Sequence, residues 1–238
     1  MELWYSIAAS IVIISVVSLL WFVPHKEVEN QEYIQIIANE NKMYLLPDSS
    51  KVWMQPGSII RYADDFNQDR KVWLKGNSLF EVRKQNGSNF RVYLNKTFIE
   101  VKGTCFQIKQ NQKGQSETTL FSGTIDFNIE ATGEIIEMKP LQKITYYPEK
   151  SQIQIEKIEN ISWENGRYNF TDIPLNRLIQ MMNQMYGTNI ILKNNIRKKS
   201  AFTGNIRYDE TIDDILDKIC FSLSLKRKES NNQIIIYN

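Results

Sequence analysis

The stretch "RKVWLKGNSLFEV" (residues 70–82) decides the fold class of this chain. Apolar and polar side chains alternate on each side of Gly76, which is the pattern of two short, half-buried strands joined by a turn. Val72, Trp73 and Phe80 are of the β-branched and aromatic types that pack well on a pleated surface. The stretch therefore predicts β structure.

The same pattern continues on both sides of this stretch, from about residue 33 to residue 158. Short alternating segments such as "KVWM" (51–54), "FRVYL" (90–94) and "CFQIK" (105–109) recur, and glycines punctuate them as turns or bulges. No long amphipathic helical pattern occurs in this block. We expect an all-β domain, either a sandwich or a short solenoid-like stack.

Two helices are predicted in the block that follows Trp163. The segment "PLNRLIQMMNQMYG" (174–187) places its apolar residues on one stripe, with Pro174 in the first turn and Gly187 at the C-terminal cap. The segment "TIDDILDKICFSL" (211–223) has a similar stripe, and Thr211 and Asp214 have capping-box spacing. We interpret the methionines of the first helix as core, with a promiscuous binding face as the alternative.

Strands are expected on both sides of these helices, near residues 167–170, 189–192, 201–206, 225–228 and 233–237. The order is β-α-β-β-α-β with a final strand, which is a small α+β unit. The predicted organisation is a transmembrane anchor (1–24), a linker and first strand (25–42), an all-β domain (43–158) and a small α+β domain (159–238). The chain is therefore mainly β.

The anchor is predicted from the opening "MELWYSIAASIVIISVVSLLWFVP", in which residues 3–23 carry no charge. The run is long enough to span a bilayer, and aromatic rings lie near both of its ends. A cleaved signal peptide would need a basic start and a small-residue cleavage site, so we expect an uncleaved single-pass anchor. Lys26 alone would favour a cytoplasmic C-terminal side.

Composition excludes some classes of partner. The formal net charge of +2 is too small to indicate nucleic-acid binding. The two cysteines, Cys105 and Cys220, lie far apart in segments of different character, and we expect two free buried thiols rather than a disulfide.

A search for chemistry is negative. His25 is the single histidine of the chain, and no cysteine or histidine cluster has zinc-site spacing. Asp64, Asp65 and Asp69 share one loop that lacks the glycine and distal glutamate of a calcium loop. We therefore expect no enzyme, no metal and no cofactor.

Several motifs resemble, in order, those of the FecR-like anti-sigma regulators. They are "LPDSSKVWMQPGSIIRY" (46–62), "RKVWLKGNSLFEV" (70–82), "FIEVKGTCFQI" (98–108), "TTLFSGTIDF" (118–127) and "MKPLQKITYYP" (138–148). The segment after Trp163 resembles the small C-terminal domain of these chains, which is similar to the short N-terminal domains of secretins and TonB-linked receptors. The resemblance covers residues 43–238.

This sequence departs from the family pattern in three places. Ser49 and Ser50 stand where the family writes Gly-Ser, and Asn77 stands where it usually has Glu; we interpret these as surface-type changes. The family carries a cytoplasmic sigma-binding segment before its span, whereas only Met1 and Glu2 precede the span here. The resemblance thus supports the periplasmic sensing domains, and no residues of this sequence correspond to the sigma-binding segment.

The resemblance implies a regulator in the inner membrane whose C-terminal domains are periplasmic, which outweighs the charge of Lys26. Its implied partners are the signalling domain of a TonB-dependent outer-membrane receptor, of the kind that serves iron or glycan uptake, and an extracytoplasmic-function sigma factor. The sigma factor would be a direct partner only if a cytoplasmic segment exists upstream of Met1. Docking by strand addition would suit the terminal apolar strand Gln233, Ile234, Ile235, Ile236 and Tyr237. The same isoleucines could instead simply fill the core of the small domain.

An adhesion or glycan-binding β module is the alternative function. Trp53 and Trp73 could stack on sugars if exposed, although their place in alternating strands favours core packing. Neighbouring genes for a sigma factor and a TonB-dependent receptor would favour the regulator.

Overall fold

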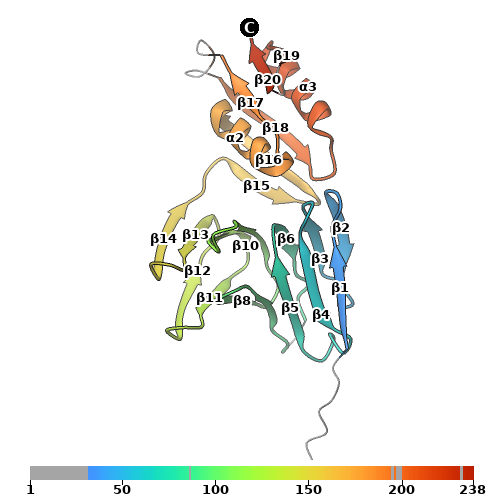
Figure 1. Cartoon of the computed structure of the whole chain (residues 1–238), viewed down its shortest axis with the longest axis vertical. Coiled ribbons are helices and arrows are strands. Elements are labelled where there is room, and N and C mark those ends of the chain that lie inside the picture. Colours follow the sequence, from blue (N-terminus) through green and yellow to red (C-terminus); the bar gives the residue numbers. More distant parts are fainter. Residues whose placement is uncertain (1–31, 86, 194–195, 197–199, 231–232) are drawn as a thin grey trace, which may run out of the picture. The chain divides into compact units, whose positions relative to one another are not determined.

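The computed structural model describes residues 32–85, 87–193, 196, 200–230 and 233–238. Tyr33–Asn238 form one compact unit (Figure 1). The predicted anchor, residues 1–24, lies outside the described residues. Within the described part of the chain, no helix is long and apolar enough to cross a membrane.

The first seven-stranded sheet, sheet A, has the strand order β1-β4-β5-β7-β8-β11-β12. Its strands are β1 (Tyr33–Ile37), β4 (Ile59–Ala63), β5 (Arg70–Lys75), β7 (Phe90–Tyr93), β8 (Thr97–Val101), β11 (Ile125–Ile129) and β12 (Glu134–Met138). Neighbours are antiparallel except for β5 and β7, which pair in parallel because the chain leaves this sheet between them.

The second seven-stranded sheet, sheet B, has the order β14-β13-β10-β9-β6-β3-β2 and is antiparallel throughout. Its strands are β2 (Lys42–Leu45), β3 (Lys51–Met54), β6 (Ser78–Glu81), β9 (Cys105–Gln110), β10 (Ser116–Ser122), β13 (Gln142–Tyr147) and β14 (Gln152–Lys157). The quoted stretch 70–82 therefore contributes one strand to each sheet, β5 to sheet A and β6 to sheet B.

Sheets A and B enclose one hydrophobic core. Inward side chains of both sheets are fully buried in it, among them Ile60 and Phe90 of sheet A and Phe80 and Phe106 of sheet B. Alternation along each strand sends the intervening side chains to the outer faces. The expected all-β block is thus a pair of facing sheets around one core, and each sheet adds its strands in chain order, as a solenoid-like stack does.

The remaining strands form two three-stranded sheets around the two helices. Sheet C has the order β15-β16-β18 and sheet D the order β17-β20-β19. Their elements are β15 (Ile161–Glu164), β16 (Arg167–Pro174), α2 (Leu175–Tyr186), β17 (Ile190–Leu192), β18 (Ala201–Arg207), α3 (Ile212–Leu223), β19 (Lys226–Ser230) and β20 (Gln233–Tyr237). The predicted α+β order is confirmed from β16 onward, and β15 is an additional strand that was not predicted from the sequence.

The helix ends follow from local chemistry. The Thr211 hydroxyl accepts a hydrogen bond from the backbone N–H of Asp214 at 3.2 Å, as the capping-box spacing predicts. Gly187 ends α2 with a left-handed φ of 64°, which glycine adopts without steric cost. The placement of Pro174 in the first helical turn is wrong: with φ −55° and ψ 129° it is the extended residue before the helix.

Candidate functional site

Strand β20, the predicted partner-binding strand, lies at the centre of sheet D. It pairs in parallel with β17, where Ile235 is opposite Ile191, and antiparallel with β19, where Ile235 is opposite Lys228. Both of its backbone edges are therefore used. The expectation that β20 offers a free edge for strand addition is wrong; the edges of sheet D belong to β17 and β19.

The two faces of β20 differ. Ile236 is fully buried, and Ile234 and Tyr237 pack against the same core, so core packing describes these residues. Ile235 alternates to the opposite face, where it is only partly covered. The Lys193 ammonium lies 5.5 Å from the centre of the Tyr237 ring. That residues 233–237 contact a partner stays a prediction. The contact would be made by the outer face of sheet D, on which Ile235 lies.

Phe221 on α3 is a large apolar side chain that the interpretation of the sequence missed. It is 90% exposed, whereas Ile219 and Cys220 next to it are buried. The exposure of Phe221 could have been predicted from the sequence, because Phe221 does not belong to the apolar stripe that residues 211–223 form at helical spacing.

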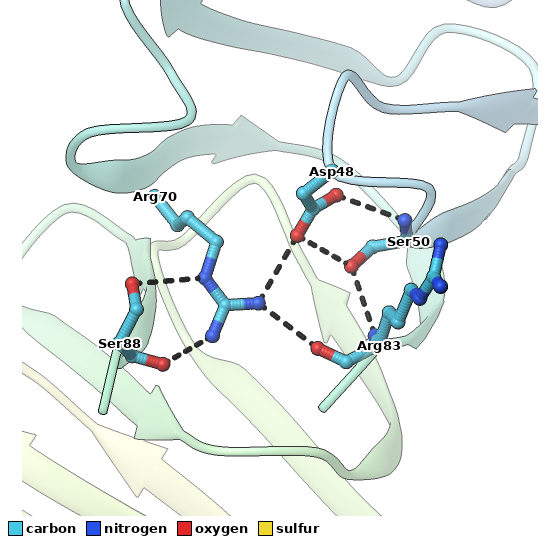
Figure 2. A network of polar contacts seen from close by, with 5 residues as sticks. All are labelled: Asp48, Ser50, Arg70, Arg83 and Ser88. Carbon is cyan, nitrogen blue, oxygen red and sulfur yellow. Dashed lines mark hydrogen bonds and ion pairs between the residues drawn. The ribbon is translucent and has the colours of Figure 1, made fainter. Parts of the chain in front are cut away.

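A buried polar network underlies the first family motif (Figure 2). The side chains of Arg70 and Asp48 are both 0% exposed and form an ion pair, with Arg70 Nη1 donating to Asp48 Oδ2 at 3.1 Å. The same nitrogen donates to the carbonyl oxygen of Arg83 at 2.9 Å, and Arg70 Nε donates to Ser88 Oγ at 3.2 Å. Arg70 thereby ties the turn after β2 to the loop between β6 and β7.

Asp48 also organises its own turn. Its carboxylate accepts from the backbone N–H of Ser50 at 2.8 Å and from the Ser50 hydroxyl at 2.7 Å. Ser50 Oγ in turn accepts from the backbone N–H of Arg83 at 3.0 Å. Ser49 between them has a φ of 67°, a left-handed conformation that suits glycine, which the family has there.

The interpretation of the departures as surface-type changes holds for Ser49, which is exposed, and is wrong for Asn77. Ser50, where the family also has Ser, is fully buried in the network just described. Asn77 is partly buried: its side chain donates to Gln55 Oε1 at 3.0 Å and accepts from the backbone N–H of Gln110 at 2.9 Å. Its carbonyl oxygen also accepts from the Ser58 hydroxyl at 2.8 Å. Asn77 therefore connects three segments at one end of the two sheets.

The outer face of sheet B meets the α+β region. Trp53 and Leu79 of sheet B belong to the same buried cluster as the residues of α2 and α3. The rings of Trp53 and Trp163 meet edge to face with centroids 5.1 Å apart, and the Tyr208 hydroxyl donates to the carbonyl oxygen of Trp53 at 3.2 Å. The expectation that Trp53 is a core residue is confirmed, since it is 7% exposed.

Trp73 lies instead on the outer face of sheet A, in a row of aromatic rings. Its ring stacks on Tyr93 with centroids 5.5 Å apart and an interplanar angle of 18°, and Tyr93 stacks on Phe98. The Arg61 guanidinium lies 5.2 Å from the centre of the Trp73 ring. These ring faces cover one another, so they do not form the open platform on which a sugar would stack.

Neither of the two cysteine thiols is activated. Cys105 and Cys220 are free thiols, and burial raises the pKa of both. In the described part of the chain, no group of three or more histidine, cysteine, aspartate or glutamate side chains is placed to hold a metal.

Solved structures share this fold. Two crystal structures of a "putative anti-sigma factor" from Parabacteroides distasonis, at 2.50 and 1.65 Å resolution, are 21% and 20% identical to this chain. They cover 87% and 86% of this chain and 99% of their own, with TM-scores of 0.54 and 0.55. At this identity the likeness establishes the fold. No curated protein matches the chain.

Family models match in two consecutive regions. The model described as FecR protein matches residues 32–126, and the model described as FecR, C-terminal, matches residues 167–236. The matched regions contain the motifs of residues 46–62 and 70–82 and both helices. The chain carries a FecR domain followed by a FecR C-terminal domain, and it belongs to the FecR family.

Proposed function

We propose that this protein is a membrane-anchored periplasmic regulator in cell-surface signalling. It relays the state of a TonB-dependent outer-membrane receptor to an extracytoplasmic-function sigma factor. The observation that carries the proposal is the ordered pair of family matches, at residues 32–126 and 167–236. The proposed domains remain an anchor (1–24), a linker and first strand (25–42), an all-β domain (43–158) and a small α+β domain (159–238).

The receptor's signalling domain docks on the outer face of sheet D. Ile235 is partly exposed there and is flanked in register by Ile191 on β17 and by Lys228 on β19. Strand addition, if it contributes, uses the free edge of β19 rather than β20, because β20 already pairs on both sides.

The test is a calorimetric titration of the full chain in neutral detergent with the signalling domain of the receptor. Ile235→Glu places a charge on the proposed docking face and should weaken binding at least ~10-fold. Ile155→Glu is the matched control, since Ile155 is a 51% exposed isoleucine on edge strand β14 of sheet B. It should leave the affinity unchanged.

A wild-type chain that does not bind the signalling domain would overturn the proposed function. Equal weakening by Ile235→Glu and Ile155→Glu would instead overturn only the docking face. Thermal unfolding of both variants checks that they are folded. A proline at Ile235 is unsuited to the test, because it would interrupt pairing inside a three-stranded sheet.

A glycan-binding module is the competing function, and the geometry of the tryptophans disfavours it. Trp53 is buried, and the faces of the Trp73 ring lie against Tyr93 and Arg61. Neighbouring genes for a sigma factor and a TonB-dependent receptor remain the quick discriminator between the two functions.

A further inference from the structure

A polar cleft of about 240 Å³ lies between the outer face of sheet B and helix α2. Strands β9, β10 and β13 supply one wall, through side chains such as Lys109 and Lys143. The exposed face of α2 supplies the other wall through Arg177 and Gln180. Both family domains therefore contribute to this cleft.

Positive charge predominates among the ionisable groups that line the cleft. Lys109, Lys143 and Arg177 carry positive charge, and Glu117 is the one carboxylate in the lining. Lys143 is neutralised from outside by Glu156 at 2.9 Å. Arg177 has no ion pair or hydrogen bond of its side chain among the described residues, and its guanidinium is free to receive an anion.

The positive charge of Lys109 is only partly compensated by its neighbours. Its ammonium donates one long hydrogen bond of 3.4 Å to the neutral amide oxygen of Gln184. Burial lowers the pKa of Lys109, and Lys143 lowers it further, whereas Glu117 on the neighbouring strand raises it. A second negative charge in the cleft would offset the loss of hydration around this ammonium.

A buried hydrogen-bond donor in the wall of the cleft is left over. Gln107 and Tyr168 are 7% and 1% exposed, and the Gln107 amide nitrogen and the Tyr168 hydroxyl are 2.7 Å apart. If the amide donates, the hydroxyl proton has no acceptor among the described residues. If the amide is turned over and the hydroxyl donates, the amide N–H groups are left instead. Either arrangement leaves a donor that an acceptor in the cleft would satisfy.

We propose that this cleft binds a small oxyanion, a phosphate or a carboxylate, between the sandwich and helix α2. Arg177 and Lys109 supply the charge, and the Gln107–Tyr168 pair supplies a neutral donor. Phe121 and Met181 form an apolar part of the wall that accommodates a short hydrocarbon body. Because its contacts come from both domains, the ligand stabilises their packing. The inference goes beyond the regulatory function and does not depend on it.

The test uses the full chain in neutral detergent, titrated calorimetrically with inorganic phosphate and, separately, with butyrate, at constant ionic strength set by chloride. Wild type should bind at least one of the two. Arg177→Gln removes a charge-assisted contact from an exposed position and should weaken binding at least ~10-fold. Lys113→Gln is the control, because Lys113 is exposed in the turn between β9 and β10 and does not line the cleft.

A third variant should change the affinity for the anion in the opposite direction. Glu117→Gln removes the one carboxylate that competes with the ligand, so it should strengthen binding a few-fold. If wild type binds phosphate more tightly than butyrate, the cleft is a phosphate site. If it binds butyrate more tightly, the ligand is a carboxylate with an apolar body. The proposal is overturned if neither anion binds wild type, or if Arg177→Gln and Lys113→Gln weaken binding equally, which would mean attraction by general surface charge.

Discussion

At the scale of single residues, the pair of Asp48 and Arg70 gives two residues of the family motifs a structural role. Both side chains are fully buried. In the protein interior a charge is stable only if it is paired and hydrogen-bonded. The pair satisfies this condition through Ser50, Ser88 and the carbonyl oxygen of Arg83. Removing one partner leaves the other charged and buried.

Asp48→Ala should therefore lower the free energy of unfolding by about 3–5 kcal/mol. Urea denaturation of the full chain, followed by tryptophan fluorescence, measures this loss. A loss below about 1 kcal/mol would show that water reaches Arg70 in the folded protein.

Ser49→Gly, one residue away, provides a control of opposite sign. Ser49 is exposed and holds a φ of 67°, which costs a residue with a side chain more than it costs glycine. The replacement should raise the stability by up to about 1 kcal/mol. The Asp48→Ala and Ser49→Gly pair thus separates the loss of a charge partner from any general sensitivity of this turn.

At the scale of elements, the two helices begin in different ways. α3 has the Thr211 cap and two aspartates in its first turn, Asp213 and Asp214, which favour the positive end of the helix dipole. α2 has no side-chain cap, and the Leu175 N–H instead donates to the carbonyl oxygen of Ser200 at 2.9 Å. α3 is thus started by local chemistry and α2 by tertiary contact.

Thr211→Ala should cost about 1 kcal/mol of stability, because it removes the acceptor for the Asp214 N–H. Thr211→Ser keeps that acceptor and should stay close to wild type. Thermal unfolding monitored by circular dichroism compares the two. Equal losses would mean that the methyl group of Thr211, rather than its hydroxyl, supports the helix.

Elements were predictable from the sequence where the signal is local. The apolar stripes and caps of α2 and α3 lie within short windows, and the helices occupy the expected residues. The position of β20 was not predictable in this way. Its parallel partner β17 lies about forty residues upstream, and the apolar pattern of residues 233–237 suits a central strand as well as an edge strand.

The two tryptophans illustrate the same limit. Trp53 and Trp73 both lie in alternating strands, so alternation assigns each to a face but does not say what covers that face. The α+β region covers the outer face of sheet B at Trp53. At Trp73, on the outer face of sheet A, the neighbouring contacts are the aromatic rings and Arg61. The two cases differ in what packs on the outer face, which alternation within a strand does not show.

At the scale of the whole molecule, the two family domains share buried structure. Trp53 and Leu79 from sheet B lie in one cluster with residues of both helices. The Trp163 indole N–H also donates to the carboxylate of Glu81 in sheet B. Each domain therefore needs the other to bury part of its apolar surface.

Residues 33–238 should consequently unfold in a single transition. Trp53→Ala removes the ring that faces Trp163 and should cost about 3–5 kcal/mol, while the transition remains single. Far-ultraviolet circular dichroism and tyrosine fluorescence, recorded in the same denaturant series, should give coincident midpoints. Two separated midpoints in the wild-type protein would contradict the shared core.

The position of β1 has a mechanical consequence. β1 is an edge strand, held by one antiparallel ladder to β4, and most of its side chains are exposed. Tension that enters the folded unit through residue 32 loads this ladder before any other. Since β1 adds little to the core, it can be pulled away while most of the sandwich stays folded. Detachment of β1 would then release tension before the rest of the sandwich and the α+β region unfold.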